Sequence, residues 1–411
     1  MATITPFKAI RPAKDKVAHV VSKSYQSYSR RELNAQLSFN PFSFLHILNP
    51  GYKYAKSVSG QERFQLVHNR YLEFLEDHIF LKDAKDSFYL YEVQKDDFKC
   101  CGLFCGTSVA DYRNDIIKKH EDTLQHREAL FANYLNTAKF NAEPVLMTYA
   151  DNVEIAAIIC LEKTKEPEYQ FTTTDKAHHK LWVLSDAKTI KKLQKAFKNL
   201  DALYIADGHH RSASSNLLAQ NLEKTNPSHN GSEPYNSFMS YLIPESEIRI
   251  YEFNRKIRDL NGLSKEEFLI KLDSSFRITN HGELPYKPSK KHHFSMYLDG
   301  QFYSLYLRKK MHVFTDALSQ LDTQILFKTI LEPILAINDL RKDKRIHYGY
   351  GQHNMLKMKE EIDKGKFAVG FGMVPITISE IKAIADAGLV MPPKSTYIEP
   401  KLRSGLTIYE L

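Results

Sequence analysis

The sequence predicts a mixed α/β protein built from two domains. Its 411 residues exceed what one hydrophobic core usually organises, and a chain of this length is expected to form two to three domains. Hydrophobic residues make up 43% and charged residues 26%, close to globular averages, so the chain is not disordered as a whole. Segments with alternating apolar residues are interleaved with segments of near-helical spacing. We place the two α/β domains at residues 1–245 and 246–411.

The first half contains a predicted hairpin and an amphipathic helix. Alternation over residues 87–93 indicates a strand, and residues 101–106 indicate its partner. Apolar residues recur at near-helical spacing among charges over residues 118–135, as expected of an amphipathic helix. A strand over residues 144–149 follows this helix.

A strand, a tight turn and a helix are predicted in the middle of the chain. A basic helix over residues 187–200 leads into the apolar run 203–206, and Asp207-Gly208 then breaks the pattern before a helix that runs to about residue 222. Residues 223–236 are polar and rich in Pro, Gly and Asn, so we expect an exposed, mobile loop there.

The C-terminal half also alternates between strands and helices. Strands are expected near residues 238–243 and 294–307, and helices near residues 318–331 and 379–387. The stretch 391–397 cannot be helical at its start because of its two prolines.

The longest apolar stretch near the middle, residues 155–161, is far shorter than the ~20 residues of a membrane-spanning helix. We interpret it as a buried strand and expect no membrane partner. The N-terminus has neither the charged start nor the apolar run of a secretory signal, so a cytoplasmic protein is expected. The four cysteines lie in or beside apolar segments and are interpreted as reduced core residues: Cys100, Cys101, Cys105 and Cys160.

Positive charge exceeds negative charge by 57 residues to 49, which gives a net charge of +8. The excess is scattered, and its densest clusters, at residues 290–293 and 308–310, flank short strand-like runs. Charge alone therefore gives little support to nucleic-acid binding.

The residues with the strongest chemical signal are Asp207-Gly208-His209-His210-Arg211. They stand where a strand turns into a helix, and a helix N-terminus is a ready anion site. Gly208 permits unusual backbone geometry, and Arg211 can donate hydrogen bonds to two phosphate oxygens at once. His209 and His210 add hydrogen-bond donors or a titratable group. Asp207 is a candidate Mg²⁺ ligand or proton acceptor. The competing interpretation is that Asp207 only caps the helix.

Other ligand-binding patterns are weaker. The small residues from Ser212 onward keep the first helical turn slim enough for an anion to approach, and Lys394, with Lys401 and Arg403, offers a second group of phosphate-type donors. A zinc site formed by the pairs His178-His179 and His209-His210 has poor spacing. No Walker-type loop and no dinucleotide-binding glycine pattern is present, so a nucleotide must be held in another way.

Four stretches together closely resemble the bacterial domain-of-unknown-function 1015 family: residues 206–211, 40–46, 179–182 and 391–397. The resemblance spans nearly the whole chain. The element at residues 207–211 also resembles the phosphate-binding element of the ParB and sulfiredoxin superfamily, which includes nucleotide-hydrolysing partition proteins and free-serine kinases. This second resemblance implies a ParB/sulfiredoxin-like core in the N-terminal half with an α/β C-terminal extension.

The superfamily resemblance implies that Gly208, His209, His210 and Arg211 hold a nucleotide or substrate phosphate, with Asp207 close to the transferred group. It implies a phosphotransferase that uses ATP or ADP with Mg²⁺ and acts on serine or phosphoserine, as a kinase or as a phosphatase. The alternatives are a nucleotide-dependent DNA-binding protein of ParB type and a non-catalytic phosphate-binding module. One departure from the family concerns Gln26, which stands where many relatives have a carboxylate.

Overall fold

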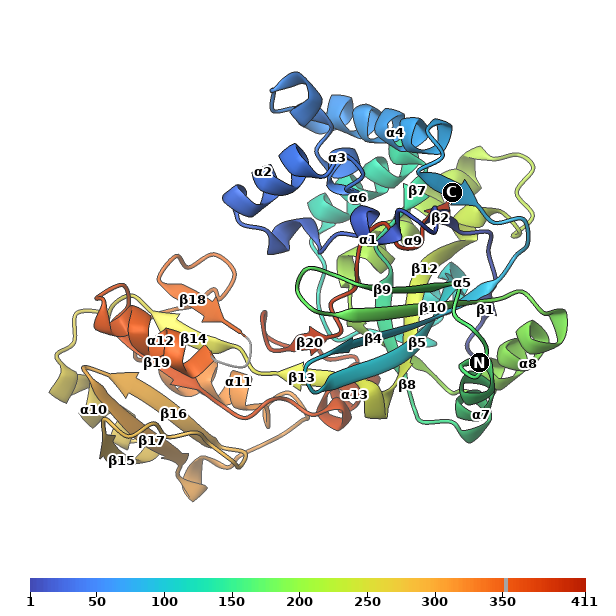
Figure 1. Cartoon of the computed structure of the whole chain (residues 1–411). Coiled ribbons are helices and arrows are strands. Elements are labelled where there is room, and N and C mark those ends of the chain that lie inside the picture. The colour runs from blue at the N-terminus through green and yellow to red at the C-terminus, as the bar shows by residue number, and fades with distance from the viewer. Residues whose placement is uncertain (351–353) are drawn as a thin grey trace. The chain divides into compact units, whose positions relative to one another are not determined.

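The computed structural model describes residues 1–350 and 354–411, which form two compact units. Unit 1 comprises residues 1–118, 122–248 and 400–411, and unit 2 comprises residues 119–121 and 249–399. Both units combine sheets with helices, which confirms the predicted mixed α/β class (Figure 1). The chain leaves unit 1 after Ile248 and returns to it at Pro400, so unit 2 is inserted in the sequence of unit 1.

A nine-stranded mixed sheet forms the centre of unit 1. Its order is β6-β11-β8-β12-β5-β4-β10-β9, with β1 paired to β5 beside this path. The predicted hairpin is confirmed, since β4 and β5 pair antiparallel with Leu90 opposite Leu103. The strands are β1 (Ile4–Thr5), β4 (Phe88–Lys95), β5 (Phe98–Ser108), β6 (Ile117–Lys118), β8 (Val145–Tyr149), β9 (Tyr169–Thr172), β10 (His178–Leu184), β11 (Leu203–Asp207) and β12 (Ser237–Pro244).

Four helices contribute to the core on one face of this sheet. Ile155, Leu193, Phe197 and Ala213 from these helices share one buried apolar cluster with strand residues such as Ile205. The four helices are α5 (Val109–Arg113), α7 (Val153–Glu162), α8 (Ala187–Lys198) and α9 (His209–Thr225).

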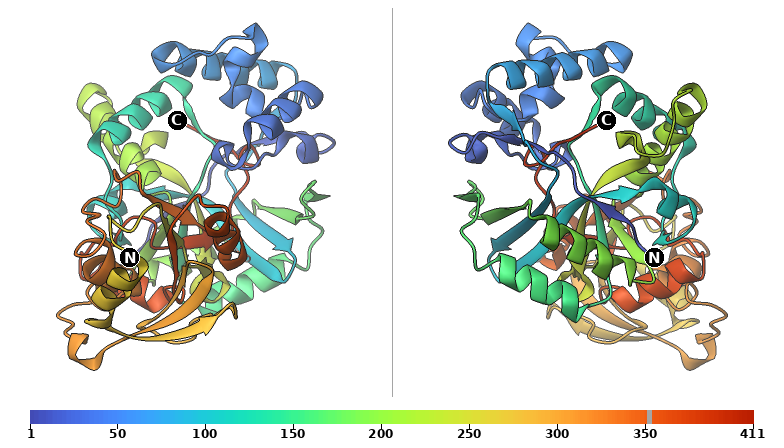
Figure 2. Two further views of the ribbon diagram at one scale, coloured as in Figure 1. Left: turned by 90° about the vertical axis from the view of Figure 1, so that its left-hand side faces the viewer. Right: turned by 90° about the vertical axis from the view of Figure 1, so that its right-hand side faces the viewer.

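The remaining helices of unit 1 pack around a second, aromatic cluster that includes Tyr71, Phe80 and Phe140. Helices α2 to α4 lie together as one group, drawn in blue in Figure 2. These elements are α1 (Val17–Val20), α2 (Arg30–Phe39), α3 (Leu45–Leu48), α4 (Gly60–Glu76), α6 (Gln125–Ala138), the strand pair β2 (Ile10–Pro12) and β3 (Phe80–Lys82), and the pair β7 (Phe140–Asn141) and β21 (Tyr409–Glu410).

Unit 2 is built on a six-stranded antiparallel sheet of order β15-β17-β16-β19-β14-β18. The apolar stretch 294–307 forms two of its strands, which turn back at Asp299-Gly300. The elements are β13 (Arg249–Tyr251), β14 (Asn254–Ile257), α10 (Lys265–Asp273), β15 (Phe276–Gly282), β16 (His293–Leu298), β17 (Gln301–Leu307), α11 (Asp322–Leu326), β18 (Ile346–Gly349), α12 (Asn354–Asp363), β19 (Val369–Gly372), α13 (Ile378–Asp386) and β20 (Tyr397–Glu399).

The apolar stretch 155–161 is not a buried strand, as predicted, but part of helix α7. The side chain of Asn152 caps this helix by accepting a hydrogen bond from the Ile155 amide at 3.0 Å. Apolar content alone does not separate a buried strand from a helix over so short a run. Within the described residues, no helix combines the length and the apolar character needed to cross a membrane.

The structure also corrects three details of the sequence predictions: the start of one helix, the burial of one cysteine and the start of one loop. The helix predicted over 118–135 begins at Gln125, and it buries Leu135 while Leu130 stays half exposed. Cys160 is exposed, so only the other three cysteines belong to the core. The polar stretch 223–236 is exposed along most of its length, but α9 extends into it as far as Thr225.

Candidate functional site

The predicted strand, turn and helix at Asp207 is present in unit 1. Strand β11 ends at Asp207, Gly208 adopts the left-handed conformation with φ of 105°, and α9 begins at His209. Gly208 is the N-cap residue and no side chain caps α9, so Asp207 is not a helix cap. A Cβ atom at position 208 would lie 2.9 Å from Nε of Arg211. The backbone conformation therefore favours glycine, and a larger residue would also push aside the Arg211 side chain that folds back over this position.

Two cations flank the carboxylate of Asp207. Nζ of Lys401 donates a hydrogen bond to Oδ2 at 3.0 Å, and Nη2 of Arg211 lies 3.7 Å from the same oxygen. Burial raises the pKa of Asp207, but the charges of Arg211 and Lys401 outweigh this effect and hold it at about 2. The Asp207 side chain is 41% exposed, so the ionised carboxylate and its two cations are accessible from solvent.

The other residues predicted at this turn differ in accessibility. His209 is buried and His210 is half-buried. Ser212 is fully buried, and its hydroxyl donates to the carbonyl oxygen of His209 at 3.0 Å, which leaves it poorly placed for a ligand. Arg211 also donates through Nη1 to the carbonyl oxygen of Pro144. Asp207 and Arg211 at the turn are thus partly exposed beside Lys401, whereas Ser212 faces inward.

The second predicted group of phosphate donors is divided between the two units. Lys401 belongs to unit 1 and pairs with Asp207, whereas Lys394 belongs to unit 2. Nζ of Lys394 lies 5.7 Å from the ring centre of Phe253, also in unit 2. The predicted role of Lys394 in binding phosphate stays a prediction.

Arg403, the third predicted donor, lies in a buried polar network that the sequence analysis missed. It donates to Oδ1 of Asp175 at 2.5 Å and to Oγ1 of Thr173 at 3.1 Å. Thr173 in turn meets Nε2 of His179 at 3.1 Å, and the Tyr91 hydroxyl meets Nδ1 of His179 at 2.7 Å. Both ring nitrogens of His179 are therefore engaged by hydroxyl groups rather than placed for a metal ion.

The charges in this network are fixed by their surroundings. Burial and the positive charge of Arg403 lower the pKa of His179 to about 3, so this ring is neutral. Although burial opposes ionisation, hydrogen bonds from Thr173 and Arg403 hold the pKa of Asp175 well below its usual range. The side chain of Gln26 lies outside the described residues, so the departure from the family at this position is not tested.

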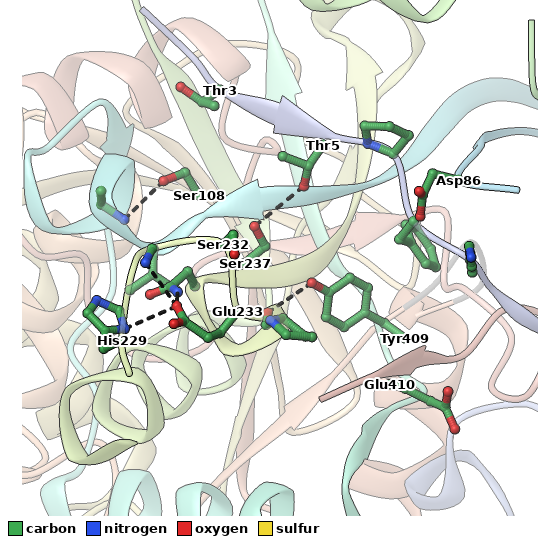
Figure 3. Close-up of a pocket in the computed structure, with 18 of the residues that line it drawn as sticks. Thr3, Thr5, Asp86, Ser108, His229, Ser232, Glu233, Ser237, Tyr409 and Glu410 are labelled. Carbon is green, nitrogen blue, oxygen red and sulfur yellow. Dashed lines mark hydrogen bonds and ion pairs between the residues drawn. The ribbon is translucent and has the colours of Figure 1, made fainter. Parts of the chain in front are cut away.

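A separate cavity of about 810 Å³ lies in unit 1 near the other end of α9 (Figure 3). Its lining includes Glu223, which is fourteen residues beyond His209 on α9 and therefore roughly 20 Å away at 1.5 Å per residue. Polar side chains line it, such as Thr5, whose Oγ1 lies 3.4 Å from Oγ of Ser237, and His229, whose Nδ1 lies 3.1 Å from Glu233. The predicted site at Asp207 and this cavity are thus distinct.

A family model described as "Protein of unknown function (DUF1015)" matches residues 4–324. The chain belongs to this family. The DUF1015 match covers the nine-stranded sheet and the turn after β11, and it confirms the family resemblance read from the sequence. No curated protein matches the chain.

Several solved structures resemble this DUF1015 protein distantly. A free serine kinase in complex with AMP is 14% identical, with 73% of this chain and 88% of that chain covered and a TM-score of 0.33. SbnI with a C-terminal truncation, from Staphylococcus aureus, is 13% identical, with 72% and 82% covered and a TM-score of 0.37. A conserved hypothetical protein from Pyrococcus furiosus is 14% identical, with 72% and 90% covered and a TM-score of 0.30. Similarity at this level carries no argument about activity.

Proposed function

We propose that this protein is a small-molecule phosphotransferase that moves a phosphoryl group between a nucleotide, ATP or ADP, and serine or phosphoserine. The observation that carries the proposal is the group formed by Asp207, Arg211 and Lys401 at the N-terminus of α9. One ionised carboxylate and two cations meet there on a turn that no side chain caps.

The phosphate is proposed to bind between the turn and its two cations. The start of α9 carries the positive end of the helix dipole, which favours an anion. The Arg211 side chain is 29% exposed and can exchange its contact with Asp207 for a bidentate contact to phosphate oxygens. Lys401, with a side chain 42% exposed, adds a second charge that can move to the phosphate.

Asp207 is proposed to orient the acceptor hydroxyl rather than to act as a strong base. With a pKa of about 2, it is ionised at neutral pH but accepts a proton only weakly. Phosphoryl transfer passes through a loose transition state that needs positioning and charge neutralisation more than early proton removal. A serine hydroxyl donating to Asp207 would be held beside the phosphate that Arg211 and Lys401 bind.

The immediate surroundings of Asp207 do not fit a Mg²⁺ ion held by this carboxylate alone. Mg²⁺ prefers several oxygen ligands, and Asp207 offers a single carboxylate to which Lys401 already donates. We therefore expect Mg²⁺ to arrive with the nucleotide phosphates, and the roles proposed for Asp207, Arg211 and Lys401 do not depend on it.

The test is phosphate exchange followed by ³¹P NMR. The purified full chain is incubated with Mg²⁺ and with ATP or ADP plus serine, and in the reverse direction with AMP or ADP plus phosphoserine. We expect phosphoserine to form or to be consumed, and we expect Arg211→Ala to abolish this exchange. If all four mixtures stay unchanged while the protein binds nucleotide at the turn, the phosphotransferase is excluded and the non-catalytic binding module is supported.

A further inference from the structure

Helix α7 exposes an apolar face to solvent. Val153 is 87% exposed and Leu161 is 64% exposed, and the residues between them on the same face are Ala156, Ala157 and Cys160, all exposed. Ile155 on the opposite face is buried in the core. A surface helix normally turns polar residues outward, and a contiguous exposed apolar face marks an interaction surface.

Helix α8 exposes a face made of lysines. Its sequence AKTIKKLQKAFK contains five lysines and no acidic residue, while Leu193 and Phe197 fill its buried face. All five are exposed, and none has an ion-pair partner in residues 1–350 and 354–411. This one helix carries five charges of a chain whose net charge is +8. The lysines are Lys188, Lys191, Lys192, Lys195 and Lys198.

The apolar and basic faces lie side by side. Helices α7 and α8 contact each other, and Figure 1 shows them as neighbours. Ile155 of α7 and Leu193 of α8 enter the same core cluster on one face of the nine-stranded sheet. Because both helices bury their inner faces against the same side of the sheet, both outer faces point away from it. Together they form one surface, which we call the α7–α8 surface.

A hollow at the edge of this surface adds places for anionic groups. It has a volume of about 370 Å³ and lies between β1 and α8. Lys191, Lys195 and Lys198 line it together with Thr3 and Thr5. Three lysine side chains around one hollow suit a phosphate-bearing group.

We propose that the α7–α8 surface docks on an anionic lipid membrane. Lysines attract acidic headgroups, and an adjacent apolar face can enter the boundary between headgroups and acyl chains. A nucleic acid would match the lysines but not the apolar face, and a second copy of the chain would bring the same lysines into one interface. The expectation of no membrane partner rested on a buried strand at residues 155–161, and that segment is a helix with one exposed face. The proposal is independent of the phosphotransferase.

The test is co-sedimentation of the full chain with lipid vesicles. We expect binding to vesicles of phosphatidylserine and phosphatidylcholine at low ionic strength, and little binding to vesicles of phosphatidylcholine alone. Each lysine near an acidic membrane strengthens partitioning by about fivefold, so Lys191→Glu/Lys195→Glu should lower it by more than twentyfold. The control Lys56→Glu/Lys85→Glu removes two exposed lysines elsewhere in unit 1 that also have no ion pair within the described residues, and it should have little effect.

A second pair of variants tests the apolar face. Val153→Gln/Leu161→Gln keeps the charge and should weaken vesicle binding severalfold, with an unchanged melting temperature because both side chains lie in solvent. Absence of binding to acidic vesicles, or equal losses in the α8 double variant and its control, would overturn the proposal. Duplex DNA binding that persists at 200 mM salt and depends on α8 but not on Leu161 would also overturn it. So would a concentration-dependent dimer that the apolar variant separates into monomers, if no vesicle binding is found.

Discussion

Lys401 donates a hydrogen bond to Asp207 at 3.0 Å although the two residues are 194 positions apart in the sequence. Unit 2 is inserted between them in the chain. The carboxylate at the start of α9 therefore receives one cation from its own helix, Arg211, and the other from the segment that returns after unit 2. The positive charges of both partners lower the pKa of Asp207.

Arg211→Ala should weaken binding of a nucleotide or phospho-substrate by tenfold or more. A charge-assisted hydrogen bond contributes about 1.5 to 3 kcal/mol, and the variant removes a bidentate donor. Isothermal titration calorimetry measures the effect. The matched control is Arg113→Ala, because Arg113 pairs with Glu223 near the other end of α9. Equal affinity for the nucleotide in the Arg211 variant and the wild type would show that phosphate does not bind at this turn.

Gly208→Ala should reduce phosphate affinity, but less than the loss of Arg211 does. The added Cβ would meet Nε of Arg211 at 2.9 Å and displace the guanidinium. Gly231→Ala is the control, since Gly231 also has a positive φ, of 88°, but nothing within 4 Å of the added atom. Both variants carry backbone strain, so only the difference between their affinities reports on Arg211. If the two variants lost phosphate affinity equally, backbone strain alone would explain the loss.

Asp207→Asn should lower the single-turnover rate strongly and leave nucleotide affinity nearly unchanged. A neutral amide accepts a hydrogen bond from the serine hydroxyl less strongly than an ionised carboxylate does. Arg211 and Lys401 remain in this variant to bind phosphate. If Asp207 had only a structural role, the rate would be unaffected. Rapid-quench kinetics and thermal melts of the two proteins separate these cases, and a full rate in a folded variant would remove Asp207 from the mechanism.

Asp322 should make the stability of unit 2 depend on pH. Burial raises its pKa to about 6, although the His292 amide donates to it at 2.8 Å. The folded state therefore binds more protons than the unfolded state between about pH 4 and 6, so the free energy of unfolding falls as pH rises through this window. Asp322→Asn should raise the melting temperature at pH 7.5 and change it little at pH 4. A lower melting temperature at pH 7.5 would show that the carboxylate is stabilising.

Duplex DNA should bind weakly and without sequence preference. The lysine face of α8 can contact phosphates, but such binding releases counterions and falls steeply with salt. Fluorescence anisotropy at 50 mM and 200 mM salt should show binding that disappears at the higher concentration. A tight complex that survives 200 mM salt and selects one sequence would favour the alternative function, a DNA-binding protein of ParB type.

Local patterns in the sequence predicted the elements around the turn, and contacts between distant segments explain what was missed. The apolar run 203–206, the break at Gly208 and the following helix were all read correctly because each signal lies within a few residues. The partnership of Arg403 with Asp175 joins segments that are 228 residues apart, and no local pattern encodes it. The same is true of the pairing of Lys401 with Asp207.

Helix α7 shows a different limit of sequence reasoning. Its run of apolar residues predicted burial, because most such runs are covered by the rest of the chain. Val153 and Leu161 are exposed instead. Composition therefore identified the hydrophobic segment but did not show which of its residues are buried. Ser212 was expected beside the ligand, and its hydroxyl is buried and donates to a backbone carbonyl, so its role there stays a prediction.

The insertion of unit 2 also sets the order in which the parts of the protein become available during synthesis. Residues 249–399 leave the ribosome before residues 400–411, and domains generally fold as units while the chain is still being made. Unit 2 can thus fold while unit 1 still lacks β21 and Lys401. Asp207 and Arg211 are translated about two hundred codons before Lys401, so the Asp207 carboxylate of a nascent chain lacks its second cation until residue 401 has been made.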